Sequence, residues 1–213
     1  MPRRFAAAAA ALLALALVAS ACGSVKKTTS TSGPGPTTTA SSGLAAPFAP
    51  TGPKVAPAFT LKDQFGTPIS LAQYRGKAVL LTFLYVHCPD VCPLITAALK
   101  TTTDKLGANA KKVQVVAISV DPVGDTPKDV RAYLAARGVL HRFQYLVGTR
   151  KQLTPIWRKY GIASVPDKKL GRLIGHTGIV IGIDAKGNVR GYYPSTPLKP
   201  AWMIHDVPLL AKT

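Results

Sequence analysis

The feature that most constrains the fold is an unbroken apolar segment at residues 78–85, which reads Ala-Val-Leu-Leu-Thr-Phe-Leu-Tyr. Its β-branched and aromatic side chains leave no polar face, which is typical of a strand covered on both sides of its sheet. Residues 113–119 repeat the pattern. Such strands occur where helices cover both faces of a largely parallel sheet, so the segment predicts an α/β fold.

Helical patterns separate and follow these strands. Each of them ends at a glycine, the residue that most readily adopts the left-handed conformation at a helix end. The three predicted helices cover residues 93–106, 126–137 and 149–160.

The last third of the chain predicts a hairpin. Residues 177–183 and 189–193 are strand-like and flank the turn sequence Asp-Ala-Lys-Gly-Asn. A final helix is expected to start near Lys199, and two short strands are expected at residues 58–61 and 69–71. The whole pattern predicts an α/β sandwich with a mixed central sheet flanked by helices and a C-terminal β-hairpin.

The N-terminus has the pattern of an export signal. Arg3 and Arg4 precede an almost purely Ala, Leu and Val stretch, which ends in small residues directly before Cys22. This predicts a signal peptide at residues 1–21 and resembles a bacterial lipobox, in which the cysteine is lipidated, although Ala19 stands where leucine is usual. An ordinary cleaved signal peptide and an uncleaved anchor are the alternatives.

The segment after Cys22 has the composition of a tether. From residue 23 to residue 43, 17 of 21 residues are Gly, Ser, Thr or Pro, which is too little apolar surface to offset the entropy of ordering the chain. We therefore expect a lipidated cysteine and flexible tether at residues 22–54 and one folded domain at residues 55–213. This layout predicts a lipid-anchored protein on the extracytoplasmic side of the cell membrane.

The charged residues limit the kinds of active site and binding partner that the chain can have. The chain of 213 residues has 27 Lys and Arg against 9 acidic residues, all of them aspartate. Without glutamate, a HExxH metalloprotease helix or a Glu-based glycosidase pair is excluded. The sequence contains no interleaved basic and aromatic motif, which argues against nucleic acid. The positive charge instead favours anionic lipid headgroups or acidic protein partners.

Two cysteines carry the candidate chemistry. Cys88 and Cys92 lie four residues apart, at the end of the buried strand and the start of the predicted helix. That spacing places both on one side of a helical turn, where the helix dipole favours thiolate over thiol. The pair can form a redox-active disulfide or bind a soft metal. A purely structural disulfide is the third alternative, but so short a loop would constrain little of the unfolded chain.

A histidine is the natural third ligand. His176 lies just before the strand at residues 177–183, in a loop that faces the cysteine-bearing helix in a thioredoxin-like fold. Two thiolates and one imidazole suit Cu(I), and they accept Cu(II) with an added oxygen or water. A structural zinc site usually has a fourth protein ligand. His87 is the rival ligand, although its place next to Cys88 should direct it elsewhere.

The ordered set of motifs resembles the Sco/SenC family of copper chaperones. The matching segments are Tyr-Val-His-Cys-Pro-Asp-Val-Cys-Pro at residues 85–93, Ile-Ser-Val-Asp-Pro at 118–122 with Asp-Thr-Pro at 125–127, and His176 ahead of Ile-Val-Ile. The resemblance spans roughly residues 58–210. It implies a thioredoxin-like fold, copper bound by Cys88, Cys92 and His176, and a role in assembling the binuclear copper centre of cytochrome c oxidase. The acceptor would be the copper-bearing oxidase subunit or another copper protein.

The chain departs from the family pattern at two positions. The family often has Thr or Ser where Val86 stands, and an aspartate where Gly175 stands. If that aspartate supports the imidazole in relatives, its absence weakens copper binding here.

Two alternatives to a copper carrier remain at this stage. One is a thiol–disulfide oxidoreductase that uses Cys88 and Cys92 as a catalytic redox pair. The other is a peroxidase-like relative, which is the weakest because the Pro-x-x-x-Thr-x-x-Cys context is absent. Asp121 and Asp90 can support the metal or serve as turn and helix-cap residues. The basic segment at residues 168–172 can dock an acidic partner or form a solvated loop.

Overall fold

The computed structural model describes residues 43–52, 54–166 and 174–212. The predicted signal peptide, Cys22, most of the predicted tether and the basic segment at residues 168–172 lie outside the described residues. Within the described ranges, none of the helices combines the length and apolar character needed to cross a membrane.

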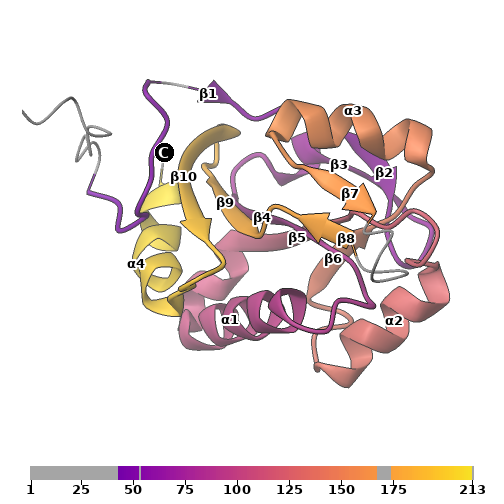
Figure 1. Cartoon of the computed structure of the whole chain (residues 1–213). Coiled ribbons are helices and arrows are strands. Elements are labelled where there is room, and N and C mark those ends of the chain that lie inside the picture. Colours follow the sequence, from indigo (N-terminus) through magenta and orange to yellow (C-terminus); the bar gives the residue numbers. More distant parts are fainter. Residues whose placement is uncertain (1–42, 53, 167–173, 213) are drawn as a thin grey trace, which may run out of the picture. The chain divides into compact units, whose positions relative to one another are not determined.

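A mixed six-stranded sheet forms the centre of the domain, in the order β1-β10-β9-β4-β5-β6 (Figure 1). β4, β5 and β6 are parallel, whereas β9 runs antiparallel to both β4 and β10. Every residue of β4 is buried, as its apolar sequence predicts. The strands are β1 (Lys54–Val55), β4 (Ala78–Leu84), β5 (Val113–Ser119), β6 (Phe143–Leu146), β9 (Ile179–Ile183) and β10 (Asn188–Pro194).

Helices cover both faces of this sheet. In Figure 1, α1 and α2 lie below the sheet and α3 lies above it, while α4 packs against α1. The helix starts follow from the sequence, because Thr126 caps α2 and a Thr149–Gln152 capping box opens α3. The helices are α1 (Val91–Lys105), α2 (Pro127–Ala136), α3 (Arg150–Tyr160) and α4 (Pro200–Leu210).

Two short ribbons complete the domain. β2 (Thr60–Lys62) pairs with β3 (Pro68–Ser70), and β7 (Ser164–Pro166) pairs with β8 (Ile174–His176), both antiparallel. Two 3-10 helices, Leu71–Tyr74 and Gly107–Lys112, link larger elements. The β7–β8 ribbon is absent from the sequence prediction, because its strands are only three residues long and lack clear alternation.

The folded part of the chain begins before the boundary placed at Val55. The backbone N–H groups of Ala45 and Ala46 donate to the Asp206 carboxylate at 2.6 and 2.9 Å, and Phe48 forms a bridge with Tyr192 on β10. We call residues 44–48 the N-terminal strap. Its Ala- and Pro-rich sequence has no periodicity, so only the tertiary contacts reveal that it packs against the domain.

Candidate metal centre

The two cysteines follow the central strand β4. The Cys88 N–H donates to the Tyr85 carbonyl at 3.3 Å, which turns the chain toward α1. Cys92 lies in the first turn of α1, and its own N–H donates to the Cys88 sulfur at 3.4 Å. Both thiols are free rather than joined in a disulfide, and they are 8% and 0% exposed. The local helix start therefore holds both sulfurs together, as the spacing predicts.

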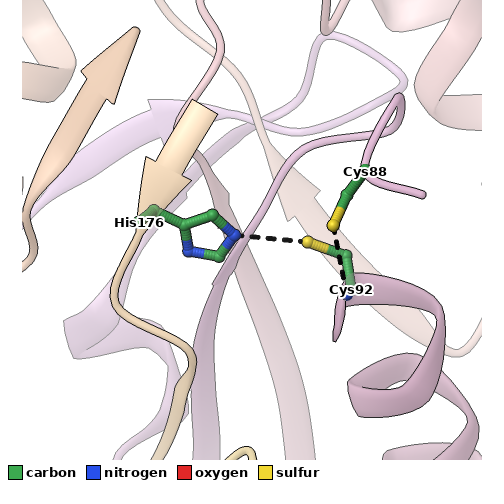
Figure 2. Close-up of side chains that lie close together, drawn as sticks. All are labelled: Cys88, Cys92 and His176. Carbon is green, nitrogen blue, oxygen red and sulfur yellow. Dashed lines mark hydrogen bonds between the residues drawn. The ribbon is translucent and has the colours of Figure 1, made fainter. Parts of the chain in front are cut away.

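His176 comes from the end of β8 and points its ring toward the cysteines (Figure 2). Its Nε2 lies 3.3 Å from the Cys92 sulfur, and its Nδ1 lies 3.2 Å from the Thr177 carbonyl. A proton on Nδ1 donated to that carbonyl leaves the Nε2 lone pair directed at the sulfurs. The Tyr85 ring packs edge-on against the imidazole, with the centroids 5.6 Å apart.

Close backbone packing fixes the segment after His176. A Cβ on Gly178 would lie 2.4 Å from the Ser195 hydroxyl oxygen and 3.4 Å from a Val91 methyl carbon, and the Ser195 N–H donates to the Gly178 carbonyl at 3.1 Å. Only glycine fits this approach without displacing its neighbours. The ligand atoms of Cys88, Cys92 and His176 lie within 4.8 Å of one another.

The two thiols differ in acidity. The hydrogen bond from the Cys92 thiol lowers the pKa of Cys88 far below that of a free thiol. The same hydrogen bond and burial raise the pKa of Cys92. The pair therefore shares one proton, with thiolate character on Cys88. A metal that binds both sulfurs must displace the remaining proton.

The donor set fits a soft metal. Two sulfurs and one imidazole nitrogen match the preference of Cu(I) for soft and borderline ligands. Within the described residues no fourth His, Cys or Asp ligand joins this group, whereas structural zinc sites are usually closed by four. Because His176 is only half-buried, the site is open on the imidazole side.

The other candidate residues lie apart from this group. His87 clusters instead with Asp121 and Asp125. Asp121 accepts the backbone N–H groups of Val123 and Gly124, which is the hydrogen bonding of a turn aspartate. The Asp90 side chain makes no helix-capping hydrogen bond.

The sequence places Asp125 in the family motif at residues 125–127 but assigns it no role in a site. The available signal was its place directly before the Thr-Pro start of α2, in a segment that also holds Asp121.

The sequence also matches a known protein family. Residues 49–211 match the family model SCO1/SenC. A SCO2-like protein of Rickettsia typhi is 26% identical over 145 residues, which are 66% of this chain and 70% of that protein.

Two solved structures share the architecture. The copper-bound ScoI of Bradyrhizobium japonicum is 27% identical with a TM-score of 0.64, covering 73% of this chain and 99% of that one. Apo Sco1 of Thermus thermophilus is 28% identical with a TM-score of 0.68, covering 80% and 99%. The thioredoxin-like α/β fold expected from the sequence is thereby confirmed, and the chain belongs to the SCO1/SenC family.

Proposed function

We propose that this protein is a copper metallochaperone that holds copper through Cys88, Cys92 and His176. The observation that carries the proposal is the convergence of two sulfurs and one imidazole nitrogen within 4.8 Å. A relative of the same fold and family, ScoI of Bradyrhizobium japonicum, has been solved with copper bound. Copper is cargo here, and the chain supplies the soft donors that select it.

Transfer follows from the small number of ligands. A three-ligand site with a half-buried imidazole leaves room for an acceptor thiolate to approach before any donor leaves. The unequal acidity of the sulfurs supports stepwise release, because Cys92 regains its proton readily. The family resemblance points to the binuclear copper centre of cytochrome c oxidase as the acceptor.

We also propose that the domain works on the extracytoplasmic side of the cell membrane. Residues 1–21 would be the signal peptide, Cys22 the lipidated residue, and the Gly-, Ser-, Thr- and Pro-rich residues 23–43 the tether, because the strap at residues 44–48 packs against the domain. Composition supports this layout. Membrane fractionation of the full chain and of Cys22→Ala tests it, since the anchored form should move to the soluble fraction when the thiol is removed.

The copper proposal is tested by counting Cu(I) bound to the reduced full chain. We expect about one equivalent in the wild type and strongly weakened binding in His176→Ala, because two thiolates without the imidazole leave an incomplete ligand set. His141→Ala is the matched control, since His141 is exposed and stacks on Phe65. Weak binding that is equal in wild type and His176→Ala would refute the proposal.

A thiol–disulfide oxidoreductase is the second candidate. The lowered pKa of Cys88 favours it, because a stable thiolate beside a protonated partner is the arrangement that attacks a disulfide. Reduction of a small aromatic disulfide by the wild type and by His176→Ala separates the two functions. A reductase should retain most of its rate without the imidazole, whereas a copper carrier should lose its metal.

A further inference from the structure

A second cluster of metal-ligating side chains lies outside the cysteine site. The ligand atoms of His87, Asp121 and Asp125 are within 4.8 Å of one another. The parallel strands β4 and β5 pair Leu84 with Ser119 at their carboxyl ends. The loops that follow these strands therefore meet, which brings a histidine from one loop to two aspartates from the other.

The two carboxylates are buried without a basic partner. Asp121 is 7% exposed and Asp125 is 4% exposed, and neither forms an ion pair with a lysine or arginine among the residues that the structure describes. Burial raises the pKa of Asp125 to about 6, and the neighbouring Asp121 charge adds to the effect. Adjacent buried carboxylates are costly unless a cation or a proton compensates them.

The hydrogen bonds orient both carboxylates and leave coordination capacity. The turn N–H groups bond to Asp121 Oδ1 only. Asp125 Oδ1 accepts from the Val86 N–H at 2.9 Å, while its Oδ2 accepts from the Ser119 and Tyr145 hydroxyls at 2.6 and 2.8 Å. Each carboxylate oxygen has two lone pairs, so Asp121 Oδ2 and one position on Asp125 Oδ1 remain for a ligand. Supporting bonds of this kind hold metal ligands in place.

We propose that His87, Asp121 and Asp125 form a second cation site, for a divalent transition metal. One imidazole and two carboxylates are harder donors than the cysteine pair, and among divalent ions such sites bind Cu(II) most strongly. The exposed His87 ring provides access from solvent, and water completes the coordination. The chain thus carries a soft site for Cu(I) and, between the loop after β4 and the loop after β5, a harder site for Cu(II) or Zn(II).

The test removes the two cysteines and measures whether the site of His87, Asp121 and Asp125 still binds a metal. In full-length Cys88→Ser/Cys92→Ser, titration with Cu(II) should show about one saturable site, with the paramagnetic resonance signature of one nitrogen and no sulfur ligand. Adding His87→Ala or Asp121→Asn should weaken Cu(II) binding about tenfold or more. Adding His141→Ala should leave it unchanged. Zn(II) calorimetry repeats the comparison with a second probe.

Two results would overturn the inference: no saturable Cu(II) or Zn(II) binding in the serine variant, or binding that His87→Ala and Asp121→Asn do not weaken. Because His87 is exposed, its replacement should leave the fold intact, and circular dichroism checks both variants. Cu(I) stoichiometry of His87→Ala with intact cysteines should equal that of the wild type. The copper-carrier proposal and this second site can therefore fail independently.

Discussion

The N-terminal strap should contribute substantially to stability. Asp206 is fully buried and accepts four hydrogen bonds: from Ala45 and Ala46 of the strap, from the Tyr193 hydroxyl at 2.8 Å and from His205 Nδ1 at 2.7 Å. A chain that starts at Pro47 loses the two strap donors, while one that starts at Gly43 keeps them. Hydrogen bonds to a charged group contribute about 1.5–3 kcal/mol each, so the loss is at most about 3–6 kcal/mol.

Water molecules that replace the strap will restore part of the lost hydrogen-bond stabilisation. We expect the Pro47 chain to be less stable than the Gly43 chain by about 2–4 kcal/mol, because hydration restores some of the lost bonding. In urea unfolding followed by circular dichroism, this corresponds to a midpoint lower by about 1–2 M at an unchanged slope. Equal midpoints for the two chains would refute the reasoning.

A double-mutant cycle identifies the group responsible. Asp206→Asn should destabilise the Gly43 chain strongly and the Pro47 chain less, because the strap bonds are already absent from the latter. Additive effects would show that the strap acts through other contacts.

Three further predictions concern acidity and packing. The Cu(I) affinity should rise about tenfold per pH unit near neutrality, because binding displaces the proton of Cys92, whose pKa is raised. Competition with a Cu(I) chelator at several pH values measures the affinity, and an affinity that does not change with pH would contradict the prediction. The pKa of Asp125 is raised from its ordinary 3.8 to about 6, so the protonated carboxyl favours the folded state. As the pH rises from 4 through 6, the free energy of unfolding of the metal-free wild type should fall by about 3 kcal/mol relative to that of Asp125→Asn, as measured by urea unfolding. Parallel curves of unfolding free energy against pH for the two proteins would contradict this prediction. Gly191→Ala places a Cβ 2.6 Å from the Ala46 Cβ, so thermal unfolding should show destabilisation in the Gly43 chain but little in the Pro47 chain.

Much of the sheet follows from local sequence. Runs of buried apolar residues predict β4, β5 and β9 within a few residues, because their burial leaves a continuous pattern. The turn sequence Asp-Ala-Lys-Gly-Asn predicts β10 as the second strand of the hairpin. β6 was missed because it has only four residues, one of them the polar Gln144. The strap was missed because its stability comes from Asp206, more than a hundred residues away.

In the candidate site, too, local sequence predicts some residues, whereas others are brought together only by tertiary contacts. Cys88 and Cys92 could be paired from their spacing, and the structure brings His176 to them as the sequence predicts. The grouping of His87 with Asp121 and Asp125 was not predictable. This grouping depends on the pairing of β4 with β5, which brings the loops after the two strands together, and the sequence alone does not reveal that pairing.

The imidazole and the sulfurs belong to different pieces of the domain. Cys88 and Cys92 are fixed between the central strand and α1, whereas His176 belongs to β8, a three-residue strand whose ladder partner is β7. Withdrawing the nitrogen donor requires movement of a short ribbon rather than melting of a helix, and short elements with few backbone bonds open most easily. A metal bound at this site can therefore be released by a local movement of the β7–β8 ribbon, without global unfolding of the domain.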